Sequence, residues 1–221
     1  MTIKSYVLRA GRLSQRQKLG LEKYLEHYCL PIDGKPWDLY EIFQRQAPTR
    51  VEIGFGMGAS LLTMAQEHPE INFIGIEVHR AGIGALAANL YELQLNNVRI
   101  VVGDAVSVFT TQLLSASVDG VQIFFPDPWP KQKHHKRRLI QENFVILISQ
   151  ALRINGFLHC ATDWQNYAEH ILQVLAAEST FKNQSINGNY CERPVMRPLT
   201  KFEQRGKLLG HNVWDLIFYK L

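Results

Sequence analysis

Apolar and polar positions alternate in two rhythms from residue 50 onward, and each rhythm predicts one kind of element. Short apolar runs, typical of buried strands, lie at 50–53, 73–77, 98–102, 118–125 and 157–161. Stretches with apolar residues at helical spacing follow them at 60–67, 81–95, 106–114, 139–152 and 164–178. The end of the chain, 213–221, alternates like a strand, and we expect it to pair with one near 181–186. Strands that alternate with helices indicate an α/β fold with a mostly parallel, seven-stranded sheet and helices on both faces.

The first 48 residues lie outside this rhythm. They contain Pro31, Gly34 and Pro36 after one predicted helix over 14–28. We therefore expect an N-terminal extension over 1–48 and a Rossmann-like domain over 49–221, which together form a single structural domain.

Composition narrows the class of protein. With 221 residues, 46% of them hydrophobic and 20% charged, the chain can bury a core of its own and is unlike disordered proteins. Cys29, Cys160 and Cys191 form no CxxC pair, which argues against a disulfide framework and a cysteine-type zinc site and suits the reducing cytoplasm. The start is unlike a signal peptide and no run of about 18 apolar residues occurs, so we expect neither secretion nor a membrane span. His134 and His135 have no metal-ligand spacing, and we expect no metal.

The net charge of +4 hides an uneven distribution. Three basic stretches, 1–20, 131–138 and 193–207, hold 15 of the 24 lysines and arginines but only one of the 20 acidic residues. These stretches therefore carry +14, and the rest of the chain carries −10. A basic surface on an acidic body is typical of a protein that binds a polyanion, if the fold brings the stretches to one face.

Ligands of open α/β sheets bind beyond the carboxyl ends of the strands, so the residues after each predicted strand carry the candidate chemistry. The first strand leads into a glycine loop, EIGFGMG, at 52–58. This loop fits the dinucleotide pattern GxGxxA through Gly54, Gly56 and Ala59, and it fits equally the ExGxGxG loop of S-adenosylmethionine-dependent methyltransferases. Glu52 favours the second reading, because a carboxylate repels a pyrophosphate but can pair with the ammonium group of a methionine moiety.

The second and third predicted strands also lead to acidic residues. Glu77 lies 23 residues beyond Gly54, close to the spacing of an acid that accepts hydrogen bonds from ribose hydroxyls. Asp104 follows Gly103, where a carboxylate can accept a hydrogen bond from the amino group of adenine. Both indicate a nucleoside, which NAD and S-adenosylmethionine have in common.

The fourth predicted strand leads into FPDPWP at 125–130. Three prolines fix this backbone, so that Asp127 and Trp129 are held rigidly. A rigid acid and a flat aromatic ring suit a nucleobase, through hydrogen bonds to its edge and through stacking. The basic run KQKHHKRR at 131–138 follows at once and suits phosphates.

Assembled, these motifs resemble those of the bacterial tRNA (guanine-N7)-methyltransferases. The resemblance spans nearly the whole chain through SYVLRAGRLS, EIGFGMG, IGIEVHRAGIG, PDPWPKQKHHKRR, ATDWQNYAEH and RPLTKFEQRGKLLGHNVWDL. The PDPWPK block, TKFExRG and GHxVWDL are its most specific parts. The resemblance implies a class I methyltransferase fold that methylates the guanosine at position 46, in the variable loop of tRNA, with S-adenosylmethionine as donor and S-adenosylhomocysteine as product.

The resemblance also implies roles for individual residues. Asp127 would be the catalytic residue, at the junction of cofactor and guanine. The residues that would bind the cofactor are Glu52, Gly54, Gly56, Gly58, Glu77, Asp104, Ala105 and Asp127. Those that would bind the substrate nucleoside are Lys131, Asp163, Thr200, Lys201, Phe202 and Glu203. We expect RNA phosphate contacts from Lys133, Lys136, Arg137, Arg138 and Arg205. Two positions depart from the family pattern, since Gln132 and Leu208 stand where basic residues are usual.

Other classes of protein explain less of the chain. An NAD-dependent oxidoreductase shares the glycines and Glu77, but not Glu52 or the basic run. A non-catalytic RNA-binding module leaves the acids after three consecutive strands unexplained. Methyltransferases that act on amino groups usually have an Asn/Asp-Pro-Pro-aromatic loop, and Asp127-Pro128-Trp129-Pro130 departs from that order. We expect a monomer, with a homodimer as the alternative.

Overall fold

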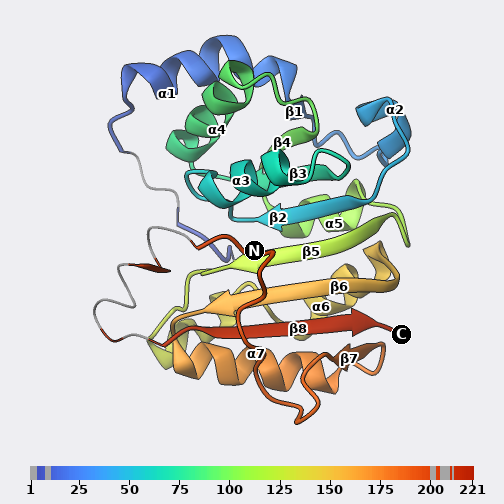
Figure 1. Ribbon diagram of the computed structural model, residues 1–221. Coiled ribbons are helices and arrows are strands. Elements are labelled where there is room, and N and C mark those ends of the chain that lie inside the picture. The colour runs from blue at the N-terminus through green and yellow to red at the C-terminus, as the bar shows by residue number, and fades with distance from the viewer. Residues whose placement is uncertain (1–3, 8–10, 200–202, 205–209, 211) are drawn as a thin grey trace.

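One mixed sheet runs through the computed structural model, which describes residues 4–7, 11–199, 203–204, 210 and 212–221 (Figure 1). Within these residues the sheet has eight strands in the order β1-β4-β3-β2-β5-β6-β8-β7. The strands are β1 (Cys29–Leu30), β2 (Thr49–Ile53), β3 (Asn72–Glu77), β4 (Val98–Val102), β5 (Val118–Phe124), β6 (Leu152–Thr162), β7 (Phe181–Asn183) and β8 (Trp214–Lys220). All neighbours from β1 to β6 pair in parallel, and β8 pairs antiparallel with β6 and β7.

Helices cover both faces of this sheet, as the periodicity predicted. The α-helices whose bounds lie within the described residues are α1 (Gln15–Leu19), α2 (Leu39–Phe43), α3 (Ala59–Glu67), α4 (Arg80–Glu92), α5 (Ala105–Thr111), α6 (Glu142–Ala151) and α7 (Gln165–Ala177). Leu61 of α3 and Leu86 of α4 belong to one buried cluster, with Phe73 of β3. Phe144 of α6 and the next residue of β3, Ile74, belong to a second cluster. Because successive side chains of a strand point to opposite faces, the two clusters form a core on each side of the sheet.

The prediction of seven strands is corrected to eight. The added strand, β1, comes from the N-terminal segment and pairs with β4 through Cys29 and Ile100. Its two residues are too few to leave an alternating pattern, so the sequence did not reveal it. Strand β6 is also longer than the predicted 157–161, because a bulge between Val118 and Gly120 of β5 allows pairing to begin at Leu152.

The N-terminal segment packs against α4. Helix α1 begins with a capping box between Ser14 and Gln17, and the chain continues through a π-helical turn, η1 (Gly20–Tyr24), and a 3₁₀ turn, η2 (Leu25–His27). A Cβ on Gly84 of α4 would lie 2.2 Å from the Gln17 carbonyl oxygen, so glycine is needed for this close approach. The domain boundary after residue 48 stays a prediction.

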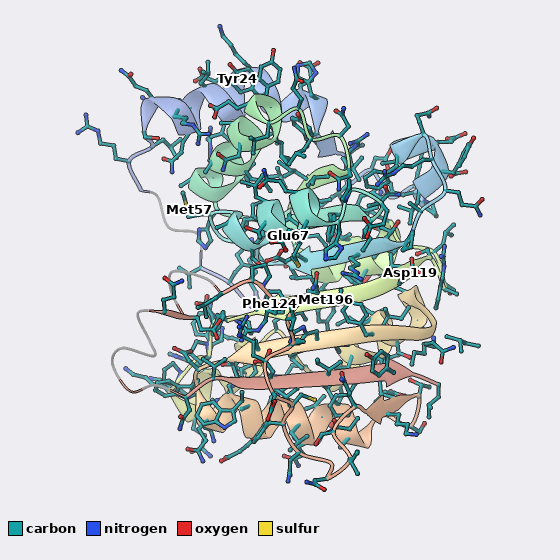
Figure 2. All side chains as sticks on the ribbon, viewed as in Figure 1. Tyr24, Met57, Glu67, Asp119, Phe124 and Met196 are labelled. Carbon is teal, nitrogen blue, oxygen red and sulfur yellow. The ribbon has the colours of Figure 1, made fainter. Side chains whose placement is uncertain are left out.

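The connection between β7 and β8 crosses the front of β8, β6 and β5 (Figure 1). Figure 2 labels Met196 of this connection beside Phe124 at the end of β5. A bridge between Cys191 and Asp215 ties the connection to β8. None of the helices in the described part of the chain has the length and apolarity needed to cross a membrane.

Candidate functional site

A pocket of about 240 Å³ lies at the carboxyl ends of the central strands. Five of the predicted cofactor residues line it, namely Gly54, Gly56, Glu77, Ala105 and Asp127. The pocket is also lined by residues that were not predicted for the site, namely Ser5, Tyr6, His79 and Phe125. Tyr6 belongs to the motif SYVLRAGRLS, which was a sign in the sequence that this segment matters.

The glycine loop has free space on its pocket side and packs closely against α4 on its other side. Gly54 and Gly56 have φ of +74° and +56°, which favour glycine, and a Cβ on either would meet no atom within 4 Å. Behind the loop, a Cβ on Gly82 of α4 would lie only 1.8 Å from the Gly56 carbonyl oxygen. Gly58, with φ +79°, begins α3. The loop therefore leaves free space beside its backbone on the pocket side, where a ligand can approach closely.

Glu77 holds the shape of this loop. One carboxylate oxygen accepts a hydrogen bond from the Gly56 N–H at 2.9 Å. The other accepts from the Val78 and His79 N–H groups at 2.6 and 3.0 Å. Since each oxygen has two lone pairs, Glu77 can still accept a hydrogen bond from a ligand.

Glu52 is a buried carboxyl group without a full set of partners. Its side chain is 3% exposed, and its Oε2 atom has no hydrogen-bond partner. Burial disfavours the charged form, and with the nearby charge of Glu77 it raises the pKa of Glu52 to about 8. Glu52 is not among the residues that line the pocket. An incompletely bonded acid behind a ligand loop fits the predicted pairing with a ligand cation.

The other predicted acids follow their strands as expected. Asp104 begins α5 and accepts a hydrogen bond from the Val106 N–H at 2.8 Å, so part of its capacity serves the helix. Asp127 is exposed at the pocket. Phe125 precedes it with φ of +52°, a strained conformation that the Phe125 N–H supports by a 2.7 Å hydrogen bond to Ala161. Asp163 is half-buried after β6 and does not line the pocket.

Trp129, which the sequence suggests for stacking on a nucleobase, already contacts two other parts of the protein. Its Nε1–H donates to the Ser5 carbonyl at 3.0 Å, and the Arg137 guanidinium lies 3.7 Å from its ring centroid. Arg137 also donates to the carbonyls of Lys4 and Tyr6. Lys4 and Tyr6 of the first basic stretch therefore contact Arg137 of the second beside the pocket, where Trp129 lies against Ser5 and Arg137.

The basic run divides into exposed and buried cations. Lys131, Lys133 and Lys136, in or beside the 3₁₀ helix η3 (Gln132–Arg137), are exposed. Arg138 is only 3% exposed and donates to Pro128 and to the Asn166 side chain at 3.0 and 2.6 Å. A phosphate contact needs an accessible side chain, so we withdraw Arg138 from the predicted contacts. His134 and His135 belong to no group of metal ligands in the described parts of the chain.

The C-terminal candidates are described only in part. Thr200, Lys201, Phe202 and Arg205 lie outside the described residues. Glu203 is 1% exposed and forms a bidentate ion pair with Arg197. Arg197 was not predicted to be buried, because nothing in its immediate neighbourhood in the sequence marks a buried arginine.

Comparisons with known proteins find similar sequences over nearly the whole chain. A family model described as "Putative methyltransferase" matches residues 46–216. A tRNA (guanine-N(7)-)-methyltransferase of Legionella pneumophila (strain Corby) is 59% identical over 99% of this chain and 98% of its own length. One of Shewanella pealeana is 49% identical over 99% of this chain and 92% of its own.

Solved structures with lower identity support the fold. The 16S rRNA methyltransferase KamB matches with a TM-score of 0.61 at 12% identity, over 85% of this chain and 95% of its own. The aminoglycoside resistance methyltransferase NpmB1 matches with a TM-score of 0.56 at 15% identity, over 84% and 95%. The expected class I methyltransferase fold is thus confirmed.

Proposed function

The chain belongs to the tRNA (guanine-N7)-methyltransferase family, and on that premise we propose that it transfers a methyl group from S-adenosylmethionine to N7 of guanosine 46 in tRNA. The observation that carries the proposal is the pocket that joins the glycine loop, Glu77 and the exposed Asp127. A cofactor cradle and a rigid acid beside a basic surface are the parts that such a transfer needs. We expect the enzyme to act as a monomer in the cytoplasm.

The residues at the glycine loop fit the cofactor. S-adenosylmethionine, when bound, supplies the electrophilic methyl group. The open backbone of Gly54 and Gly56 would lie against it, and the incompletely bonded Glu52 would pair with its ammonium group. Glu77 would accept from the ribose hydroxyls and Asp104 from the adenine amino group. Gly58 and Ala105 would shape the ends of this cradle.

Asp127 would act on the guanine by its charge. Guanine N7 has a lone pair and no proton, so its methylation needs no general base. The purine becomes cationic as the bond forms, and the carboxylate of Asp127 would stabilise that charge and accept hydrogen bonds from N1–H and N2–H. Orientation supplies the rest of the rate enhancement. Asp163 and Lys131 would help to hold the nucleoside.

The surface beside the pocket would bind the tRNA backbone. Lys133 and Lys136 are exposed there, and Arg137 joins them to Lys4 of the N-terminal segment. Contacts of this kind with phosphates depend on charge, and they weaken with salt. The roles of Thr200, Lys201, Phe202 and Arg205 stay predictions.

Methyl transfer from labelled S-adenosylmethionine to an unmodified tRNA transcript tests the proposal. A second transcript with adenosine at position 46 is the matched control. We expect label in the first and none in the second, with 7-methylguanosine as the labelled nucleoside after digestion. Label in both transcripts would reject the target base and keep the methyltransferase.

A thermal-shift measurement separates the proposal from an oxidoreductase. S-adenosylhomocysteine is expected to raise the melting temperature, and NADH is not. Stabilisation by NADH alone would reject the cofactor. No label in either transcript, with S-adenosylhomocysteine still stabilising, would reject the substrate.

A further inference from the structure

Arg197 is the centre of a buried ionic cluster outside the pocket. Its side chain is 1% exposed, and all of its bonds to carboxylates are bidentate. It donates to both oxygens of Asp215 at 2.8 and 3.0 Å, and to both oxygens of Glu203 at 2.5 and 3.0 Å. His159 Nε2 lies 2.7 Å from the same Asp215. We call these four residues the Arg197 cluster.

The cluster joins three parts of the chain that are distant in sequence. His159 lies on β6, Asp215 lies on β8, and Arg197 comes from the connection that crosses the sheet. The guanidinium lies 5.9 Å from the ring centroid of Phe124 and 5.7 Å from that of Phe125. These two residues lead from β5 into the loop that carries Asp127. Arg197 therefore contacts the base of the predicted catalytic loop on one side and Glu203 on the other.

The charges within the Arg197 cluster favour a fixed arrangement of the Asp215 and Glu203 carboxylates around the guanidinium. Burial and the charge of Arg197 lower the pKa of His159 more than Asp215 raises it, so the histidine is neutral near pH 7. The guanidinium of Arg197 thus bonds to two carboxylates. Ion pairs of this kind rarely stabilise a fold more than apolar side chains of the same volume would. What they add is direction, because the planar guanidinium fixes the angle and distance of both carboxylates.

We propose that Arg197 is a positioning residue of the methyl transfer reaction. It holds Glu203, the last residue of the predicted nucleoside-binding run TKFE, at a fixed place relative to Phe124 and Phe125. Glu203 then acts through Arg197 and is not itself a ligand of the guanine. This inference rests on the proposed function and changes the role of one predicted substrate residue.

Arg197→Lys tests the positioning role, because lysine keeps the charge but cannot make two bidentate pairs. We expect kcat/KM for tRNA to fall at least tenfold, while the Kd of S-adenosylhomocysteine stays within about twofold. Arg45→Lys is the matched control. Arg45 donates to Asn72, Pro69 and Ile71 at the amino end of β3, whereas the pocket lies at the carboxyl ends of the strands. We expect it to lower the melting temperature and leave kcat/KM for tRNA unchanged.

A purely structural role gives a different result. In that case both lysine variants would lose thermal stability, and kcat/KM per folded molecule would be that of the wild type in both. That outcome, measured well below the melting temperature, would overturn the proposal. If Arg197→Lys does not fold, Asp215→Asn, which weakens the cluster from the other side, is expected to show the same selective loss for tRNA.

A second measurement asks whether Glu203 contacts the base. Glu203→Gln is compared with the wild type on transcripts that carry guanosine or inosine at position 46, since inosine lacks the exocyclic amino group. Positioning predicts the same fold-loss in kcat/KM on both transcripts. A loss that disappears with inosine would make Glu203 a direct ligand of the amino group and overturn the proposal.

A failure of the proposed function can be distinguished from a failure of the positioning role of Arg197. Absence of methyl transfer by the wild type would reject the proposed function. The Kd of tRNA in the presence of S-adenosylhomocysteine would still test the positioning role of Arg197. The Arg197 cluster is expected to hold Glu203 of the TKFE run in place whether or not methyl transfer follows. An unchanged Kd in Arg197→Lys, in that case, would reject the positioning role.

Discussion

Two buried acidic residues, Glu52 and Asp215, lie on the same face of the sheet, and they differ in the partners that the protein provides for their carboxylates. Glu52 on β2 is the register partner of Gln122 on β5, which is the partner of His159 on β6. Register partners point to one face, so the glutamate and the Arg197 cluster belong to one row of polar groups. Glu52 has an oxygen without a partner, whereas Asp215 has an arginine and a histidine.

The protein shifts the pKa of the acid in opposite directions at the two sites. Burial and the nearby charge of Glu77 raise the pKa of Glu52 to about 8. Burial also acts to raise the pKa of Asp215, but His159 and Arg197 outweigh it and the pKa falls below its usual value. An acid that the chain leaves incomplete is the one that can gain most from a bound cation.

The largest loss of stability is expected when Arg197 is removed from the Arg197 cluster. Arg197→Met removes the guanidinium that pairs with the buried carboxylates of Glu203 and Asp215. We expect the free energy of unfolding to fall by about 3–5 kcal/mol, measured by urea denaturation. A change below about 1 kcal/mol would show that the carboxylates take up protons or water without cost, and the contrast with Glu52 would be lost.

Asp127→Ala is expected to affect catalysis and to leave the fold intact. Asp127 is exposed, so its loss removes no core packing. We expect kcat to fall by on the order of 10²–10³, the loss typical of one preorganised electrostatic contact, with an unchanged melting temperature. An unchanged kcat in a labelled-methyl assay would reject the role of Asp127.

Glu52→Gln is expected to stabilise the free protein and weaken the cofactor site. The folded protein keeps the Glu52 proton up to a pKa of about 8, while the unfolded chain loses it near 4.5. Stability is therefore lost as the pH rises between these values, and the glutamine variant avoids that loss. We expect a gain of about 1–3 kcal/mol at pH 8 and little gain at pH 4.5, with a weaker Kd for S-adenosylhomocysteine.

Calorimetry in two buffers of different ionisation enthalpy measures whether Glu52 releases a proton when S-adenosylhomocysteine binds. If the ligand's ammonium group pairs with ionised Glu52, binding at pH 7 releases a proton in the wild type and none in Glu52→Gln. Equal gains in stability at both pH values, or no proton release, would contradict the pairing.

The smallest effect concerns the cations of the basic run. Lys133→Gln and Lys136→Gln are expected to lower the salt slope of tRNA binding by nearly one unit each. Arg138→Gln is the contrasting variant, because its guanidinium is already bonded to Pro128 and Asn166. We expect it to lower stability and leave the slope unchanged. A changed slope would return Arg138 to the phosphate contacts.

Much of the fold and part of the candidate site could be predicted because their signs are local. Apolar runs separated by helical spacing gave the parallel sheet, and the rule that ligands bind at strand ends grouped Glu77 and Asp127, which now line one pocket. Strand β1 could not be predicted, since two residues form it only by pairing with β4. The roles of the site residues stay predictions until the assays are done.

The sequence alone determined the family, the strand–helix alternation and the place of the glycine loop, since glycine allows a tight turn without steric cost. These features can be predicted because they depend on residues that are close together in the sequence. Tertiary structure alone decided which charges are buried and what pairs with them. Arg197 and Arg138 resemble the solvated lysines in the sequence, but Asp215 and Asn166 reach them from 18 and 28 residues away. Burial of a charge depends on such distant partners, because only they offset its loss of hydration.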